Sequence, residues 1–268
     1  MSVIAQDKRV FPATGKADEE TGITEAPKFP WLLIAGLSLI LLIVFGALRW
    51  YQNEFSFTVG LDYFDPEFQK YWMTLFWAQL AVIGTAGAIL IPLTWFTRDK
   101  VLNITPQEEL SRYYTILAIL AIGGVILYFA LNVFTEADAA WHQVTVRDTD
   151  FTPTHIALFY GVLPLLFVGV VFAFVWVHTR MPDFAGRVSI PLAVLAGGPL
   201  LIAPNLGYNE WGHTFFYAEE LFGAPIHWGF VVLGWAFLGV GGFLVQCFNR
   251  MMKLTDLLGD EAEKPAAS

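Results

Sequence analysis

The sequence predicts an all-α protein, a polytopic membrane helix bundle of about six transmembrane helices with both termini in the cytoplasm. Of its 268 residues, 56% are hydrophobic, and the mean hydropathy is +0.56. The apolar residues form long runs with few charges, which soluble domains rarely contain. Because these runs are continuously apolar and do not alternate with polar residues, they indicate helices and not the strands of a barrel.

Six apolar runs are each about the 17–25 residues that a helix needs to cross a bilayer. They occupy residues 31–50, 72–96, 113–134, 155–178, 188–206 and 227–248. Trp and Tyr residues cluster near the ends of these runs, as in the aromatic belts at membrane interfaces. Before the third run, Thr105 and Pro106 followed by Glu108 predict a helix start, with a Thr N-cap, Pro at the first position and Glu three residues after the cap.

Polar segments flank the apolar region. Residues 1–29 contain an acidic patch, several glycines and prolines and no early apolar stretch of the kind that a signal peptide requires. We expect residues 1–29 to be a flexible cytoplasmic tail, residues 30–252 a transmembrane helical domain, and residues 253–268 a second cytoplasmic tail.

The distribution of Lys and Arg gives the orientation. Twelve of the 15 basic residues lie before the first apolar run, in the loops after the second and fourth runs, or after the end of the sixth run. The positive-inside rule places those segments, and both termini, in the cytoplasm. The loops after the third and fifth runs therefore face the outer side of the cell membrane.

These two outward-facing loops and the run starts that follow them hold four of the five histidines, in two similar patterns. Asp138 and His142 are separated by one helical turn, and His155 follows at the start of the next run. The second pattern repeats this arrangement with Asn209, His213 and His227. Residues four apart share one helix face, so each pattern offers one oxygen and two nitrogen ligands.

The first set, Asp138, His142 and His155, combines two imidazoles with a carboxylate and is competent for zinc, copper or iron. In the second set Asn209 is a neutral and weaker donor, which favours a metal that binds imidazole well, and copper fits best. The alternatives are a hydrophilic loop with incidental histidines for the first set and histidines that cap helices for the second.

Composition excludes other classes of partner and site. The net charge of −9 argues against nucleic acid. A single cysteine, Cys247, rules out an intrachain disulfide framework and a cysteine-rich metal site, and we expect it to be a buried structural thiol. We expect no special role for His178, at the cytoplasmic end of the fourth run.

Long segments of the chain resemble the C subunit of the copper membrane monooxygenases, the family of particulate methane monooxygenase and ammonia monooxygenase. The resemblance extends from about residue 45 to residue 255 and includes GLDYFDPEFQKYWM, TRDKVLNITPQEELSR, FTEADAAWHQVTVRDTDFTPTHIALFYG, RMPDFAGRVSIPL and PNLGYNEWGHTFFYAEELFGAPIHWGFVVLGW. It implies a membrane-embedded subunit that assembles with A and B subunits into a trimer of ABC protomers. It also implies oxidation of a small inert substrate by O₂ and two electrons, supplied by a quinol or another donor. We expect methane or another short alkane as substrate, with ammonia as the alternative.

The same resemblance implies roles for the six ligand candidates. Asp138, His142 and His155 match the family's copper site designated CuC, which is also found holding zinc. Asn209, His213 and His227 match the site designated CuD. We prefer the second set as the catalytic, oxygen-activating site, because its neutral donor leaves copper under-coordinated.

Two other functions compete with the enzyme. A metal transporter would use the two sets as entry sites, but the apolar runs hold almost no ionisable residues at mid-depth to form a polar path. A non-catalytic scaffold subunit with structural metals stays open on the sequence alone. We also expect the loop at residues 206–226 to depend on bound lipid or a partner for its fold.

Overall fold

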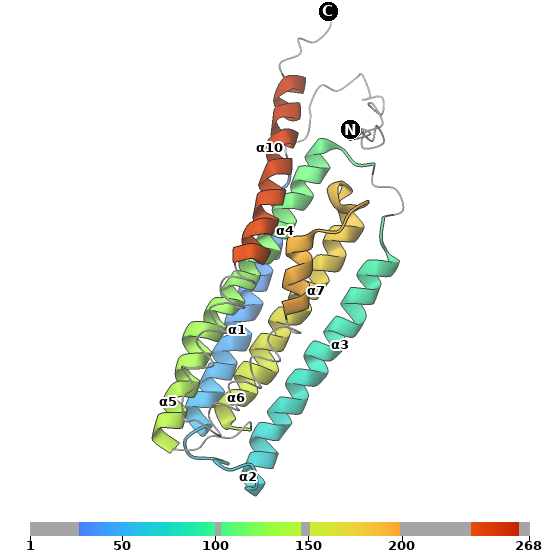
Figure 1. Ribbon diagram of the computed structural model, residues 1–268. Coiled ribbons are helices and arrows are strands. Elements are labelled where there is room, and N and C mark those ends of the chain that lie inside the picture. The colour runs from blue at the N-terminus through green and yellow to red at the C-terminus, as the bar shows by residue number, and fades with distance from the viewer. Residues whose placement is uncertain (1–26, 100–102, 146–150, 199–236, 263–268) are drawn as a thin grey trace, which may run out of the picture.

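The computed structural model describes residues 27–99, 103–145, 151–198 and 237–262, and these form a bundle of long helices (Figure 1). The described residues contain no strand, which confirms the all-α prediction. Within the described part of the chain, four continuous helical segments are long and apolar enough to cross a membrane. They are Trp31–Phe55, Pro66–Phe96, Pro106–Thr145 and Pro153–Arg180, and they contain the first four predicted runs.

Helix α1 (Trp31–Phe55) is uninterrupted, whereas each of the other three segments contains a π-helical turn. These turns are η1 (Gln69–Met73), between α2 (Pro66–Phe68) and α3 (Thr74–Phe96); η2 (Phe129–Phe134), between α4 (Pro106–Tyr128) and α5 (Thr135–Thr145); and η3 (Leu158–Val162), between α6 (Pro153–Ala157) and α7 (Leu163–Arg180). A π turn inserts one residue into the helical ladder and is frequent near functional sites. All three lie toward the same end of the bundle.

The last part of the chain is only partly described. After a short 3₁₀ turn, η4 (Pro182–Phe184), a helix begins at residue 190 and is described as far as residue 198, in agreement with the start of the fifth predicted run. Residues 199–236 lie outside the described residues, as do the loop at 206–226 and the first part of the sixth run. The predicted count of six spans therefore stays a prediction.

Helix α10 (Gly242–Ala262) continues past the predicted end of the sixth run at residue 248. Residues 253–262 of the predicted C-terminal tail are thus helical. The helix extends because Met251 and Leu254, one turn apart, pack on the bundle, and Leu254 is almost fully buried. Residues 1–26 and 263–268 lie outside the described residues.

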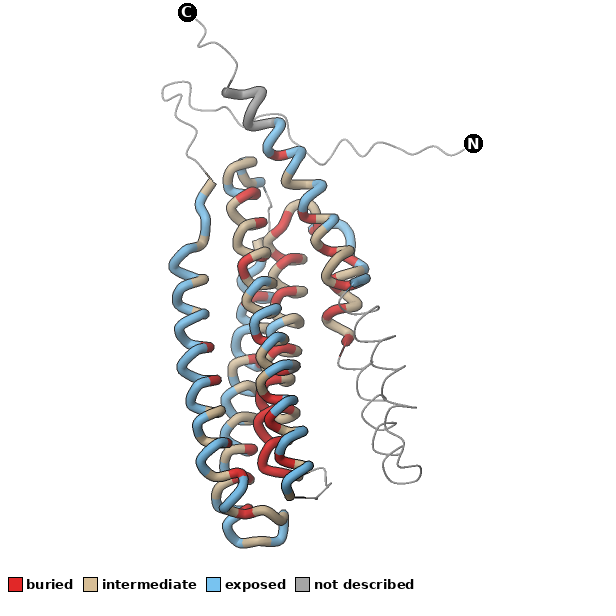
Figure 2. Tube along the Cα trace, turned by 90° about the vertical axis from the view of Figure 1, so that its left-hand side faces the viewer, coloured by how far each residue is buried: buried red, intermediate tan, exposed pale blue. Residues whose placement is uncertain are grey.

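The main core runs along the bundle between α1, α4, α7 and α10 and includes Phe45, Tyr113 and Val177. Cys247 belongs to it and is fully buried, as predicted. The outer faces of α1 and α3 remain exposed and apolar, as at Leu32 and Val82 (Figure 2). Exposed apolar faces of this extent suit a hydrocarbon environment and not water.

The start of α4 follows its predicted chemistry. The Thr105 hydroxyl accepts a hydrogen bond from the backbone N–H of Glu108 at 3.2 Å, and Pro106 is the first helical residue. The Glu108 carboxylate does not close the capping box. It pairs with Arg112 one turn along, at 2.7 Å, because the guanidinium offers a charged partner.

The two ends of the bundle differ in their elements (Figure 1). We call the end that carries α2, α5 and α6 the α5–α6 end. The opposite end, called the α10 end, carries the beginning of α4, the end of α7 and the C-terminal half of α10. At the α10 end, Nε2 of His178 accepts a hydrogen bond from the backbone N–H of Ser189 at 3.0 Å. His178 thus links α7 to the start of the next helix, a structural role that the sequence did not predict.

Candidate metal centre

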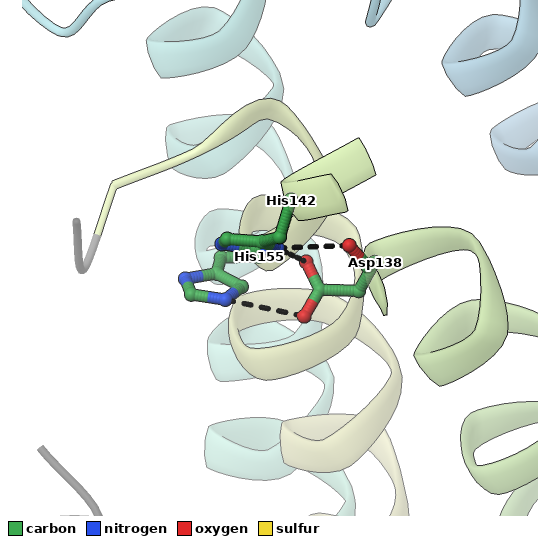
Figure 3. A group of neighbouring side chains, drawn as sticks. All are labelled: Asp138, His142 and His155. Atoms are coloured by element: carbon green, nitrogen blue, oxygen red, sulfur yellow. Dashed lines mark hydrogen bonds and ion pairs between the residues drawn. The ribbon is translucent and has the colours of Figure 1, made fainter. Parts of the chain in front are cut away.

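The α5–α6 end brings together the three residues of the first predicted ligand set (Figure 3). Asp138 and His142 lie one turn apart on α5, and His155 lies in the middle of α6. Both imidazoles lie close to the Asp138 carboxylate: Nε2 of His155 is 3.2 Å from Oδ2, and Nδ1 of His142 is 3.5 Å from Oδ1. The centres of the two imidazole rings are 4.9 Å apart.

The hydrogen bond of His142 fixes which of its nitrogens can bind a cation. Nδ1 lies 2.8 Å from the backbone carbonyl oxygen of Asp138. A carbonyl only accepts, so the Nδ1–H donates and the Nε2 lone pair remains available. A ring N–H held by a backbone carbonyl is the usual support for a metal-binding histidine.

The spacing of the three side chains fits a metal ion. Each offers one ligand atom, and these atoms lie within 4.8 Å of one another. Nitrogen and oxygen ligands lie about 2.0–2.2 Å from a bound zinc ion, so two of them can be at most about 4.4 Å apart. A small side-chain rotation is enough to close this difference. Two neutral imidazoles and one carboxylate are a suitable donor set for copper or zinc.

The charge balance of the cluster also favours a cation. The side chains of Asp138 and His155 are 14% and 12% exposed. Among the described residues, the partners of the Asp138 carboxylate are the two imidazoles and a hydroxyl, with no Lys or Arg. A mostly buried carboxylate is costly without a compensating positive charge. A metal ion bound here supplies that charge.

Residues outside the predicted set hold the cluster in place. The Thr154 hydroxyl donates to Oδ1 of Asp138 at 2.5 Å, and the Thr152 hydroxyl caps α6 by accepting the backbone N–H of His155 at 3.2 Å. The fully buried Trp141 donates from its indole nitrogen to the backbone oxygen of Ser56 at 2.5 Å, which ties α5 to the end of α1. Sequence reasoning missed these residues. The one feature of the sequence that could have identified them is their position close to the predicted ligands.

The second predicted ligand set lies outside the described residues. Asn209, His213 and His227 all fall within 199–236. Their ligand role, and the catalytic role assigned to them, stay predictions.

Comparison with known families adds an independent finding. The family model that describes the C subunits of ammonia monooxygenase and methane monooxygenase matches residues 16–258. No individual curated protein matches the chain. The family match confirms the resemblance predicted from the sequence and covers the four apolar helices, the cluster of Asp138, His142 and His155, and all three residues of the second set. The protein is therefore a membrane protein and part of a multi-subunit monooxygenase, and the chain belongs to the family of ammonia and methane monooxygenase C subunits.

Proposed function

We propose that this chain is the metal-binding C subunit of a copper-dependent membrane monooxygenase that hydroxylates methane or another short alkane. The observation that carries the proposal is the convergence of Asp138, His142 and His155 in a chain of this family. With methane the reaction is CH₄ + O₂ + 2e⁻ + 2H⁺ → CH₃OH + H₂O. One oxygen atom enters the alcohol and the other leaves as water.

In this proposal Asp138, His142 and His155 hold copper or zinc, and Asn209, His213 and His227 hold copper. Copper supplies the one-electron redox chemistry that O₂ activation requires. The chain's own residues set the conditions for binding. Asp138 provides negative charge, and the hydrogen bond from His142 Nδ1 to a backbone carbonyl keeps that ring in the tautomer that can bind. We assign oxygen activation to the second set.

We further propose that the α5–α6 end faces the outer side of the cytoplasmic membrane and that both termini are cytoplasmic. Several arginines gather in ion pairs and hydrogen bonds at the α10 end, namely Arg112, Arg180, Arg187 and Arg250. Basic residues are enriched on the cytoplasmic side of membrane proteins, which supports this orientation. Partner A and B subunits in a trimer of ABC protomers, surrounding lipids and a quinol or similar electron donor complete the proposed enzyme.

A structural role for the metal is the second candidate. Asp138 and His142 belong to α5, whereas His155 belongs to α6, so an ion bound to all three joins two helices. Such a cross-link would stabilise the α5–α6 end even if the chemistry took place in a partner chain.

Ammonia is the alternative substrate. Its product is hydroxylamine and not an alcohol, so analysis of the products separates the two enzymes.

The test compares three forms of the assembled complex in lipid nanodiscs: wild type, His142→Ala/His155→Ala and His213→Ala/His227→Ala. Copper, iron and zinc are quantified together with O₂-dependent alcohol or hydroxylamine formation. Loss of metal from both variants, with loss of turnover in the second, supports the proposal. Loss of metal with unchanged turnover in both variants leaves only the structural role, and unchanged metal content in both contradicts metal binding by this chain.

A further inference from the structure

Two glutamines outside the metal cluster reach the backbone of the short helix that carries His155. Gln52, on α1, is fully buried and donates from Nε2 to the backbone oxygen of Thr154 at 3.4 Å. Gln79, on α3, donates from Nε2 to the backbone oxygen of Ile156 at 3.1 Å. Thr154 and Ile156 are the two chain neighbours of His155. The carbonyls on both sides of this histidine are therefore held by two different helices.

Packing alone does not account for these amides. Gln79 lies in a strongly apolar part of α3, and Gln52 is fully buried near the polar end of α1. A buried amide is costly unless it is hydrogen-bonded. Neither Oε1 atom accepts a hydrogen bond from any residue in the described part of the chain. A leucine would fill a similar volume without leaving a buried oxygen unsatisfied. What only the glutamines provide is the pair of N–H groups that hold α6.

Helix α6 needs such external support. It forms the first five residues, Pro153–Ala157, of the continuous segment Pro153–Arg180, and the π turn η3 separates it from the regular helix α7. The first turn of a helix lacks intrahelical partners for its backbone N–H groups and is held less firmly than the helix interior. The residues of α6 also determine the position of the carboxylate, because the Thr154 hydroxyl donates to Asp138. Movement of this short segment would therefore displace two of the three ligand candidates together.

We propose that Gln52 and Gln79 form a clamp that positions His155 and Asp138 for metal binding. This inference rests on the proposed metal function of Asp138, His142 and His155. The two glutamines are positioning residues: they touch the backbone of α6, and they prepare the ligand geometry before a metal ion binds. Supporting residues of this kind typically change metal affinity by about 10- to 100-fold.

Gly161 lies next to the side-chain amide of Gln79. It lies in the π turn η3, and a β-carbon at this position would overlap the side-chain amide of Gln79. Among the described glycines only Gly60 has a positive φ, so the backbone conformation at Gly161 does not require glycine. The missing side chain instead leaves room for the amide that holds Ile156.

The first experiment uses Gln52→Leu, Gln79→Leu and the double variant in the assembled complex in nanodiscs. The site is assigned by difference: copper that is absent from His142→Ala/His155→Ala belongs to it. We expect each single variant to weaken copper binding at this site by about 10-fold and to change its Cu(II) electron paramagnetic resonance spectrum. Gln246→Leu is the matched control, because it removes an amide that accepts a hydrogen bond from Ser189 far from the cluster. This control should leave both readouts unchanged.

Gly161→Ala tests the same clamp without removing a polar group, and it serves if Gln79→Leu does not assemble. We expect it to weaken copper binding as much as Gln79→Leu does. Combining the two substitutions should add nothing, because both act through one hydrogen bond. Additive effects would overturn the role assigned to Gly161. Wild-type affinity and spectrum in the glutamine variants would overturn the clamp, whereas unchanged copper in His142→Ala/His155→Ala would overturn the metal site itself.

Discussion

The two ends of this bundle both hold a mostly buried carboxylate, and the partners of the two carboxylates differ. At the α10 end the Glu109 side chain is 4% exposed and binds Arg250 through two hydrogen bonds of 2.8 Å. At the α5–α6 end the Asp138 side chain is 14% exposed and meets two imidazoles and a hydroxyl. The charge of Glu109 is balanced within the chain. Asp138 is surrounded by groups that can share a cation, and in the proposed function an ion from outside would complete its charge balance.

The two carboxylates differ more in their partners than in their burial. The Glu109–Arg250 pair joins α4 to α10, and its guanidinium fork matches the carboxylate on both oxygens. Replacing one member of such a pair should lower the stability of the folded chain and leave metal binding unchanged. Replacing a member of the Asp138 cluster should affect the metal and leave folding nearly intact. Four predictions test this contrast, from the largest expected effect to the smallest.

Arg250→Met should produce the largest loss of stability. It leaves the buried Glu109 carboxylate without its charged partner, and breaking a buried ion pair in this way costs about 3–5 kcal/mol. Thermal unfolding of the complex in nanodiscs measures the effect, with metal content as the second readout. The double variant Glu109→Gln/Arg250→Met should recover most of the loss, since it removes the unpaired charge. If Arg250→Met lost more copper than folded protein, the Glu109–Arg250 pair would also affect metal binding. The two carboxylates would then not have separate roles.

Asp138→Asn should weaken metal binding at the α5–α6 end by about 100-fold, which corresponds to about 2.7 kcal/mol. Asparagine keeps an oxygen donor of nearly the same shape and removes the negative charge. The measurement is a competition titration with a copper chelator. The unfolding temperature without metal should not fall, because no buried positive charge loses its partner. A fall in that temperature as large as that of Arg250→Met would show that Asp138 is a structural carboxylate.

Thr154→Val should weaken metal binding by about 10-fold, the lower end for supporting residues. Valine keeps the branched shape but removes the hydroxyl that donates to Oδ1 of Asp138 at 2.5 Å. Thr154→Ser is the matched control and should retain wild-type affinity, since it keeps the hydroxyl. Equal affinities for the valine and serine variants would show that the hydroxyl does not orient the carboxylate.

Particular residues show how far the sequence predicts the fold. Apolar runs of sufficient length predicted the four long helices, and the pattern at Thr105 and Pro106 predicted the start of α4. The π turns carry no hydropathy signal, because inserting one residue into a helical ladder changes no residue type. The extension of α10 to residue 262 was missed for another reason: its few apolar residues, such as Leu254, form one narrow stripe in a polar segment.

The candidate site was predictable only in part. The spacing from Asp138 to His142 places both on one helix face, whereas no helical rule connects either residue to His155, which lies on another helix. The residues that support the cluster are separated from it by much of the chain: Gln52 contacts Thr154 across more than 100 positions. Gln79, inside the second apolar run, was a usable signal, since buried polar groups in membrane spans need a partner; Gln52 lies just after the first run and carried no such signal. Which backbone carbonyl each glutamine meets follows only from the packing of the helices.

Arg187→Ala should have the smallest effect and serves as the reference for an exposed ion pair. Arg187 and Asp183 are one turn apart at the α10 end, 2.5 Å between nitrogen and oxygen, and the arginine side chain is 55% exposed. Exposed pairs at this spacing contribute about 0.3–0.5 kcal/mol, because water screens the charges and ordering both side chains costs entropy. The unfolding temperature should change little, and metal binding not at all. A loss of stability approaching that of Arg250→Met would mean that the α10 end depends on all of its arginine ion pairs together. The buried pair of Glu109 would then not be the main source of stability at this end, and the comparison of Glu109 with Asp138 would fail.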